Sequence, residues 1–274
     1  MTRRFRQVDV FTDRLGYGNP LAVVADGDGF DDETMARFAR WTNLSETTFL
    51  LTPTTPEADY RVRIFTPGGE LPFAGHPTLG SCHTWLALGG EARGDRVVQE
   101  CGAGLVAVRR DGDRLAFLAP ALRRREVPAE ALATIVTALG LHPSSVLRSQ
   151  VLDNGPEWVA LLVDSAATVL AVERSAASGL PYKVGLVGPH PSGDADVEVR
   201  AFAFPIGVPE DPVTGSLNAS LAEWLVAAGV LPSRYVAAQG TALGRAGRVH
   251  ITVDDEGTWV GGHVADAVAG TLDL

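Results

Sequence analysis

Residues 200–229 read RAFAFPIGVPEDPVTGSLNASLAEWLVAAG, and this stretch decides the fold. Apolar and polar residues alternate into it as far as Phe204, which predicts a strand. A polar turn around Asp211 follows, and the chain then runs almost without charge to Gly229, where a helix is expected to end. Either Asp211 or Thr214 can cap this helix. The backbone N–H groups of a helix start suit an anion, especially a carboxylate.

The same arrangement occurs a second time in the first half of the chain. Residues 57–65 (EADYRVRIF) align with residues 194–202 (DADVEVRAF) at an offset of 137. Residues 76–81 (HPTLGS) align with residues 211–216 (DPVTGS) at an offset of 135. We interpret this repeat as an internal duplication, because a repeat so long and so few-fold does not suit a solenoid. It predicts one Gly-Ser helix start in each half: Gly80-Ser81 and Gly215-Ser216.

Two nearly uncharged helices are expected at the centre of the two halves. Residues 79–88 contain no Asp, Glu, Lys or Arg, and residues 216–228 contain only Glu223. A helix that is apolar on all sides is normally buried on all sides, and short strands flank both segments. We therefore predict an α+β fold of two pseudo-symmetric lobes, each a barrel-like, mostly antiparallel sheet wrapped around a central helix.

The repeat also sets the expected lobe boundaries. The N-terminal lobe is expected over residues 1–120, which residues from about 265 to 274 can complete, and the C-terminal lobe over residues 121–264. Residues 120–128, which carry three consecutive arginines, are expected to be an irregular linker.

Composition narrows the class of protein. The 274 residues are 46% hydrophobic and 20% charged, which is globular composition. The net charge of −10 argues against nucleic acid or an anionic membrane as the main partner. The two cysteines, Cys82 and Cys101, form no CxxC motif, and residues 1–13 lack the apolar core of a signal peptide. No apolar run reaches membrane-spanning length. We therefore expect a cytoplasmic location.

The usual signals of a cofactor or metal are missing. No GxGxxG stands between a predicted strand and helix, and no GxxxxGK[ST] occurs. The six histidines show neither HExxH nor paired spacing, which disfavours zinc. Lys183 is the only lysine and lies in no motif, which disfavours a pyridoxal phosphate Schiff base. The sequence therefore predicts no cofactor and no metal.

Three titratable residues at strand ends and helix starts are the candidates for acid/base chemistry. Glu46 stands just before an apolar run, His76 is the only histidine inside the repeated motif, and Asp211 occupies the matching turn. Each has a simple structural interpretation as well. Glu46 alone would be a rim carboxylate, His76 a capping or core histidine, and Asp211 an N-cap worth about 1 kcal/mol.

These motifs resemble the PhzF family, which has a diaminopimelate epimerase-like fold. The resemblance runs from end to end of the chain and rests on VDVFT (8–12), GNPLAVV (18–24), LSET (44–47), PFAGHPT (72–78), EDPVTGS (210–216) and QG (239–240). Val213 and residues 246–247 depart from the family pattern, which is expected to reshape the rim of the site.

The resemblance implies two lobes with the site in the cleft between them, and a homodimer. It implies that Glu46 moves a proton between substrate carbons as general base and then acid, while His76, Asp211 and Ser216 line the site. The Gly-Ser helix starts would hold the substrate carboxylate. Neither motif contains a cysteine, so racemisation by two thiols is not expected. The expected substrate-binding residues are Asn19, Ser45, Gly75, Gly80, Ser81, Gly215 and Ser216.

We therefore predict an isomerase that needs no cofactor and shifts a double bond in a small cyclic or unsaturated carboxylic acid of a biosynthetic pathway. Two alternatives stay open. One is a hydrolase or lyase on a related acid, in which Asp211 or His76 activates water. The other is a catalytically silent protein that binds a small acid.

Overall fold

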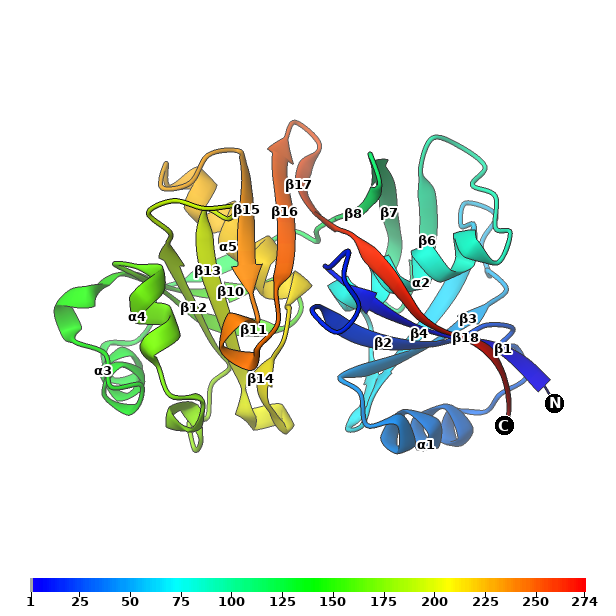
Figure 1. The fold of residues 1–274 in the computed structure, drawn as a ribbon, viewed down its shortest axis with the longest axis horizontal. Helices are drawn as coiled ribbons and strands as arrows, with labels where there is room; N and C mark the ends of the chain where they lie inside the picture. The colour runs from blue at the N-terminus through cyan, green and yellow to red at the C-terminus, as the bar shows by residue number, and fades with distance from the viewer. Residues whose placement is uncertain (1) are drawn as a thin grey trace. The chain divides into compact units, whose positions relative to one another are not determined.

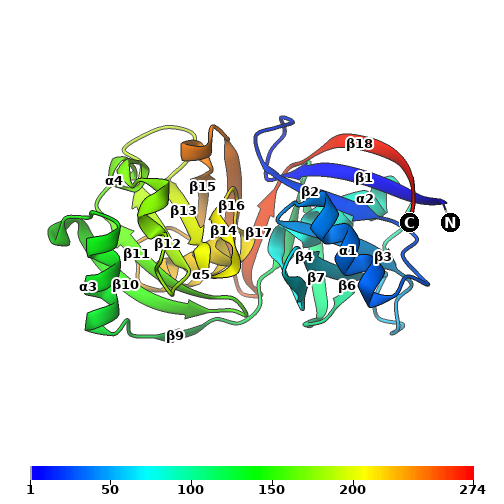
Figure 2. The ribbon, with the colours of Figure 1, turned by 90° about the horizontal axis from the view of Figure 1, so that it is seen from below.

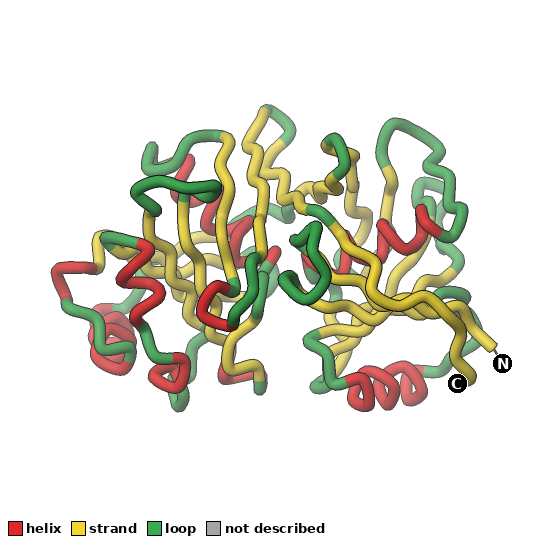
Figure 3. The backbone as a smooth tube through the Cα atoms, in the orientation of Figure 1, coloured by secondary structure: helices red, strands yellow, loops and turns green. Residues whose placement is uncertain are grey.

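Strands dominate the computed structural model, which describes residues 2–274 (Figure 3). Contacts between Cα atoms divide the chain into two compact units. Unit 1 contains the chain through Leu118 together with Gly261–Leu274, and unit 2 contains Ala119–Val260. Both units combine helices with mixed, largely antiparallel strand pairing, so the predicted α+β class is confirmed.

The described residues of unit 1, which begin at Thr2, form two helices and nine strands. They are β1 (Thr2–Val10), β2 (Asn19–Val24), α1 (Asp32–Thr42), β3 (Glu46–Leu51), β4 (Tyr60–Thr66), β5 (Gly69–Leu71), α2 (Gly75–Ala87), β6 (Val97–Cys101), β7 (Gly104–Asp111), β8 (Arg114–Leu118) and β18 (Val264–Asp273).

Unit 2 repeats this pattern with an additional helix. Its elements are β9 (Arg123–Arg125), α3 (Ala129–Ala138), β10 (Val146–Asp153), β11 (Glu157–Val163), α4 (Ala166–Ala171), β12 (Val184–Pro189), β13 (Val197–Ala203), β14 (Val208–Asp211), α5 (Gly215–Ala227), β15 (Arg234–Gln239), β16 (Gly247–Asp254) and most of β17 (Gly257–Gly262), whose last residues belong to unit 1. Short 3-10 helices cover Pro143–Ser145, Arg174–Ala177, Phe204–Ile206 and Thr241–Leu243.

Helix α2 is the centre of unit 1. It contacts β1, β2, β3, β4, β6, β8 and β18, so strands surround it. Nine of its thirteen residues are buried, which fits a segment without one polar face. Gly80 allows a close approach to β1 and β2, because a Cβ atom there would lie 2.6 Å from Leu21 Cδ2 and 3.0 Å from Val8 Cγ2.

Strand pairing in unit 1 fixes where the polar residues of the sheet emerge. β1 runs antiparallel to both β2 and β18, and the pairing of Thr2 with Asp273 brings the two ends of the described chain together (Figure 1). β2 and β3 are parallel, and Leu21 is in register with Glu46. The first residues of these two strands therefore lie at the same end of the sheet.

Helix α5 takes the corresponding place in unit 2 (Figure 2). Ten of its thirteen residues are buried. It contacts β10 and β16, and Gly185 of β12 leaves room for the side chain of Leu217. The opposite side of β12 packs on α3 and α4 through Ile135, Val169 and Leu186.

Several sequence predictions need correction. The predicted helix start at Gly80-Ser81 is wrong, because α2 already begins at Gly75 and Gly80 is an interior residue. Pro77 does not interrupt it, since the first turn of a helix needs no N–H from that position. The offset between the two central helices is therefore 140 (215 − 75 = 140), not 135.

Two further segments differ from the predictions. The expected linker contains β9, which pairs antiparallel with β10. The short helix α4 and the strand β12 had not been predicted. An Ala-rich helix of six residues and a strand that contains two glycines both give weak patterns in the sequence.

Candidate active site

The start of α2 is built without a side-chain cap. Ala74 occupies the N-cap position in an extended conformation, and no side chain within residues 2–274 makes the usual capping hydrogen bond there. His76 is the second residue of the helix and is buried. Backbone N–H groups in the first turn of a helix, together with its dipole, favour a bound anion.

Glu46 and Asn19 bring the starts of two strands to this helix start. The Oε2 atom of Glu46, the first residue of β3, lies 3.4 Å from Nε2 of His76. The Nδ2 atom of Asn19, the first residue of β2, lies 3.4 Å from Nδ1 of the same ring. The side chain of His76 is 4% exposed and that of Glu46 is 15% exposed. Three of the predicted site residues therefore meet within unit 1.

The imidazole of His76 is neutral at neutral pH. Burial lowers the pKa of His76 to about 3, and a hydrogen bond to the backbone of Pro20 opposes this shift without reversing it. A neutral ring next to Glu46 does not form an ion pair with it. The ring of His76 can therefore orient the side chain of Glu46, and at neutral pH it does not accept a proton from that side chain.

The second motif has its own local geometry in unit 2. Asp211 is the last residue of β14, and Thr214 is the N-cap residue of α5. The hydroxyl of Thr214 donates to Oδ2 of Asp211 over 2.6 Å. The sequence left Asp211 and Thr214 as candidates for the N-cap position of this helix. Thr214 occupies that position and Asp211 does not. Asn154 Nδ2 donates to the backbone oxygen of Ser216, the second residue of α5, over 3.0 Å.

Two predicted site residues are not at a helix start. Gly80 packs against β1 and β2, and the Ser81 hydroxyl donates to Thr48 Oγ1 over 2.9 Å inside the unit. Gly75 takes the place that was expected of Gly80. Ser45 directly precedes Glu46, and Gly215 and Ser216 begin α5 as predicted.

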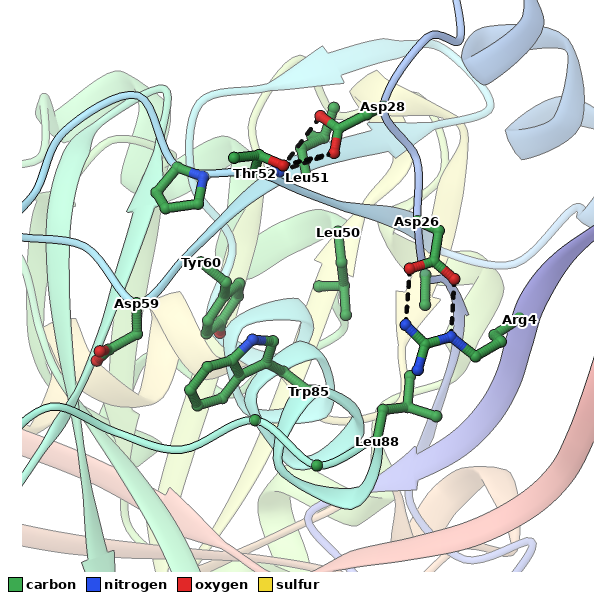
Figure 4. A pocket seen from close by; sticks show the side chains of 14 residues that line it. Arg4, Asp26, Asp28, Leu50, Leu51, Thr52, Asp59, Tyr60, Trp85 and Leu88 are labelled. Carbon is green, nitrogen blue, oxygen red and sulfur yellow. Dashed lines mark hydrogen bonds and ion pairs between the residues drawn. The ribbon is translucent and has the colours of Figure 1, made fainter.

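A pocket in unit 1 lies at the other end of α2 and contains neither Glu46 nor His76 (Figure 4). Its volume is about 310 Å³, and its wall includes Trp85, which stacks on Tyr60 with 5.3 Å between ring centroids. Arg4 pairs with Asp26, and Thr52 donates to Asp28. The charged side chains of Arg4, Asp26 and Asp28 thus already have partners within the protein, and we do not assign the chemistry to this pocket.

Metal and membrane signals are weak in the described chain. Within residues 2–274 no group of three or more His, Cys, Asp or Glu side chains is placed to hold a metal ion. No helix in that range is long and apolar enough to cross a membrane.

Solved structures establish the class of fold. The Bacillus anthracis phenazine biosynthesis protein of the PhzF family superposes with a TM-score of 0.85 over 100% of both chains, at 21% identity. A hydroxyproline epimerase from Agrobacterium vitis superposes with a TM-score of 0.66 at 15% identity, over 99% of this chain and 91% of its own. The chain therefore has the fold shared by PhzF proteins and these epimerases, as predicted.

Sequence comparisons establish the family. Residues 8–270 match the family model for phenazine biosynthesis-like proteins, PhzC-PhzF. Antisense-enhancing sequence 1 of Schizosaccharomyces pombe is 34% identical, over 97% of each chain. Trans-2,3-dihydro-3-hydroxyanthranilate isomerase of Pseudomonas aeruginosa is 35% identical, over 93% of this chain and 91% of its own. The chain belongs to the PhzF family, and it is an isomerase.

Proposed function

We propose that this isomerase shifts a double bond in a small cyclic or unsaturated carboxylic acid by moving one proton, without a cofactor. The observation that carries the proposal is the 3.4 Å approach of Glu46 to a neutral, buried His76 at an uncapped helix start. The substrate class is supported by the P. aeruginosa relative, whose name gives a dihydro, hydroxylated cyclic acid as its substrate.

Glu46 would act first as base and then as acid. Its carboxylate removes a proton from a carbon next to a double bond, and the electron pair of that C–H bond spreads along the conjugated carbons toward the substrate carboxylate. The protonated Glu46 then forms a new C–H bond at the other end of the unsaturated system. One C–H bond breaks and one forms, so nothing is added or lost. A shuttle of this kind typically contributes about 10² to 10⁴ in rate.

The substrate carboxylate needs hydrogen-bond donors that are already in place. The starts of α2 and α5 both lack a capping side-chain bond in the described chain, which leaves backbone N–H groups suited to an anion at Gly75 and Gly215. A helix start stabilises a nearby negative charge by roughly 0.3 to 2 kcal/mol. We further propose a homodimer, as the family resemblance implies, and a cytoplasmic location, which is the simplest context for the two cysteines of the sequence.

Turnover of trans-2,3-dihydro-3-hydroxyanthranilate tests the proposal, and other cyclic unsaturated carboxylates are to be screened beside it. Product mass in ordinary water must equal substrate mass, since hydrolysis or loss of water would change it.

Glu46→Gln should lower kcat by about 10² to 10⁴. It should also abolish any incorporation of deuterium from deuterated water. Exposed Glu130, on α3, supplies the control Glu130→Gln, which should behave as wild type. Full isomerisation or exchange by Glu46→Gln would rule out this role for Glu46.

A further inference from the structure

We propose that Gln239 and Thr214 are positioning residues that hold the carboxylate of Asp211 in its working orientation. The proposal rests on the proposed function together with the expectation, from the family resemblance, that Asp211 lines the site. Its basis is a buried hydrogen-bond relay within unit 2 whose direction is fixed at every step.

Gln239, the last residue of β15, is 1% exposed and uses its whole amide group. Its Oε1 atom accepts from the backbone N–H of Thr214 over 2.9 Å and from Asn218 Nδ2 over 2.8 Å. Its Nε2 atom donates to the backbone oxygen of Asp211 over 3.1 Å and to Thr214 Oγ1 over 2.9 Å. Rotating the amide by 180° would put N–H groups against two donors, so only one orientation satisfies all four contacts.

That orientation decides the direction of the next hydrogen bond. Thr214 Oγ1 accepts from Gln239, so its single proton is available for Asp211 Oδ2, which lies 2.6 Å away. A distance of this size is typical of a hydroxyl that donates to an ionised carboxylate. The relay therefore commits Oδ2 to accepting a hydrogen bond, and this contact fixes how the carboxylate of Asp211 is turned.

The corresponding glutamine of unit 1 shows what the relay adds. Gln99 Nε2 donates to Thr78 Oγ1 over 3.0 Å, and Thr78 is the fourth residue of α2 as Asn218 is of α5. The Thr78 hydroxyl, however, donates to the backbone oxygen of Ala74. In unit 1 the hydrogen bonds from Gln99 to Thr78 and from Thr78 to Ala74 only anchor the start of α2. In unit 2 the relay continues to the carboxylate at the end of β14, a contact that anchoring α5 does not require.

Three variants measured with trans-2,3-dihydro-3-hydroxyanthranilate, or with the carboxylate that the screen identifies, test the relay. Thr214→Val removes the donor with little change in volume and should lower kcat roughly tenfold to a hundredfold, with KM changed less than about threefold. Thr214→Ser, which keeps the hydroxyl, should restore most of kcat. Asp211→Asn sets the reference for a missing carboxylate.

Two further variants keep the test independent of folding defects. Gln239→Glu is nearly isosteric, but its carboxylate accepts the Thr214 proton and turns that hydroxyl away from Asp211, so the same loss of kcat is expected. Thr168→Val removes a hydroxyl that donates to Asp164 over 2.5 Å on the other side of the sheet, and it should leave kcat unchanged.

The outcomes separate the two proposals. Wild-type kcat in Asp211→Asn would remove Asp211 from the reaction and overturn the proposed function at that residue. Loss of kcat in Asp211→Asn with wild-type kcat in both Thr214→Val and Gln239→Glu would overturn the relay alone. A crystal structure of Thr214→Val should show the Asp211 carboxylate in a new or divided orientation, and an unchanged single orientation would also overturn it.

Discussion

Glu46 Oε2 lies 3.4 Å from His76 Nε2, although the two residues belong to a strand and a helix that are far apart in the chain. The contact depends on two features of unit 1. The parallel register of β2 and β3 places Glu46 at the strand end, and the early start of α2 at Gly75 places His76 in its first turn. The burial that lowers the pKa of His76 to about 3 follows from this placement.

Stability should depend on pH through His76. Its pKa is lower in the folded protein than the ordinary value near 6.5, so the unfolded chain binds the proton first. The free energy of unfolding should therefore fall as the pH falls below about 6.5, by roughly 2 kcal/mol at pH 5 from this group, and level off near the folded pKa. His76→Asn, measured by urea unfolding at pH 7 and pH 5, should lose this part of the slope.

Exposed Leu147 provides the control for this experiment. Leu147→Asn changes no titratable group, so it should keep the wild-type dependence of the free energy of unfolding on pH. Equal slopes for wild type and His76→Asn would show that His76 is not buried as a neutral ring.

Gly80→Ala should destabilise unit 1. The added methyl group would lie 2.6 Å from Leu21 Cδ2 and 3.1 Å from Val10 Cγ2, and overpacking of this kind costs roughly 1 to 3 kcal/mol. The gain in helix propensity returns up to about 1 kcal/mol. A net loss of up to about 3 kcal/mol should appear in chemical denaturation.

Gly94→Ala is the matched substitution, since no atom lies within 4 Å of a Cβ atom there. It should change the free energy of unfolding by less than about 0.5 kcal/mol. If Gly80→Ala proved more stable than wild type, the tight packing of α2 against β1 and β2 would be wrong.

The sequence was sufficient for the class of fold because its two strongest patterns are local. Alternation around residues 197–204 and the uncharged run after Gly215 predict a strand and a buried helix, and β13 and α5 occupy those places. The family motifs identified the same family that the comparisons show. The strand alternation and the uncharged helix run depend on neighbouring residues only, so the sequence shows them directly.

The candidate site could be predicted only in part, because its geometry depends on long-range pairing. The Gly-Ser match between residues 76–81 and 211–216 suggested a helix start at Gly80, yet the sheet contacts of α2 require an interior glycine there. Gln239 stood in a family motif, but its link to Asp211 through Thr214 appears only when β15 lies beside β13. A single sequence does not report that pairing.

Breaking the ion pair of Arg200 with Glu210 should be among the most damaging changes in unit 2. Nε and Nη2 of Arg200 donate to the two carboxylate oxygens over 2.8 and 2.9 Å, and the side chains are 2% and 1% exposed. Removing one partner of a buried pair typically costs about 3 to 5 kcal/mol. Glu210→Gln should therefore lower the free energy of unfolding by about that amount.

Two comparisons sharpen this prediction. The double variant Arg200→Met, Glu210→Leu should be more stable than Glu210→Gln, because no charge is left buried without its partner. Asp194→Asn breaks the exposed pair with Arg248 and should cost about 1 kcal/mol or less. A loss below 1 kcal/mol in Glu210→Gln would contradict the buried pair.

Neither cysteine should take part in the reaction. Burial raises the pKa of Cys82 to about 12, so at pH 8 roughly one thiol in 10⁴ is the reactive thiolate. Burial also raises the pKa of Cys101, which is 9% exposed. A disulfide reagent should therefore label both thiols within minutes in guanidinium chloride but neither in the native protein. Cys82→Ala and Cys101→Ala should each retain kcat and KM, because Cys82 lies inside α2 and is fully buried. Rapid labelling of Cys82 in the native protein, or loss of turnover in Cys82→Ala, would instead support a mechanism that uses a thiol.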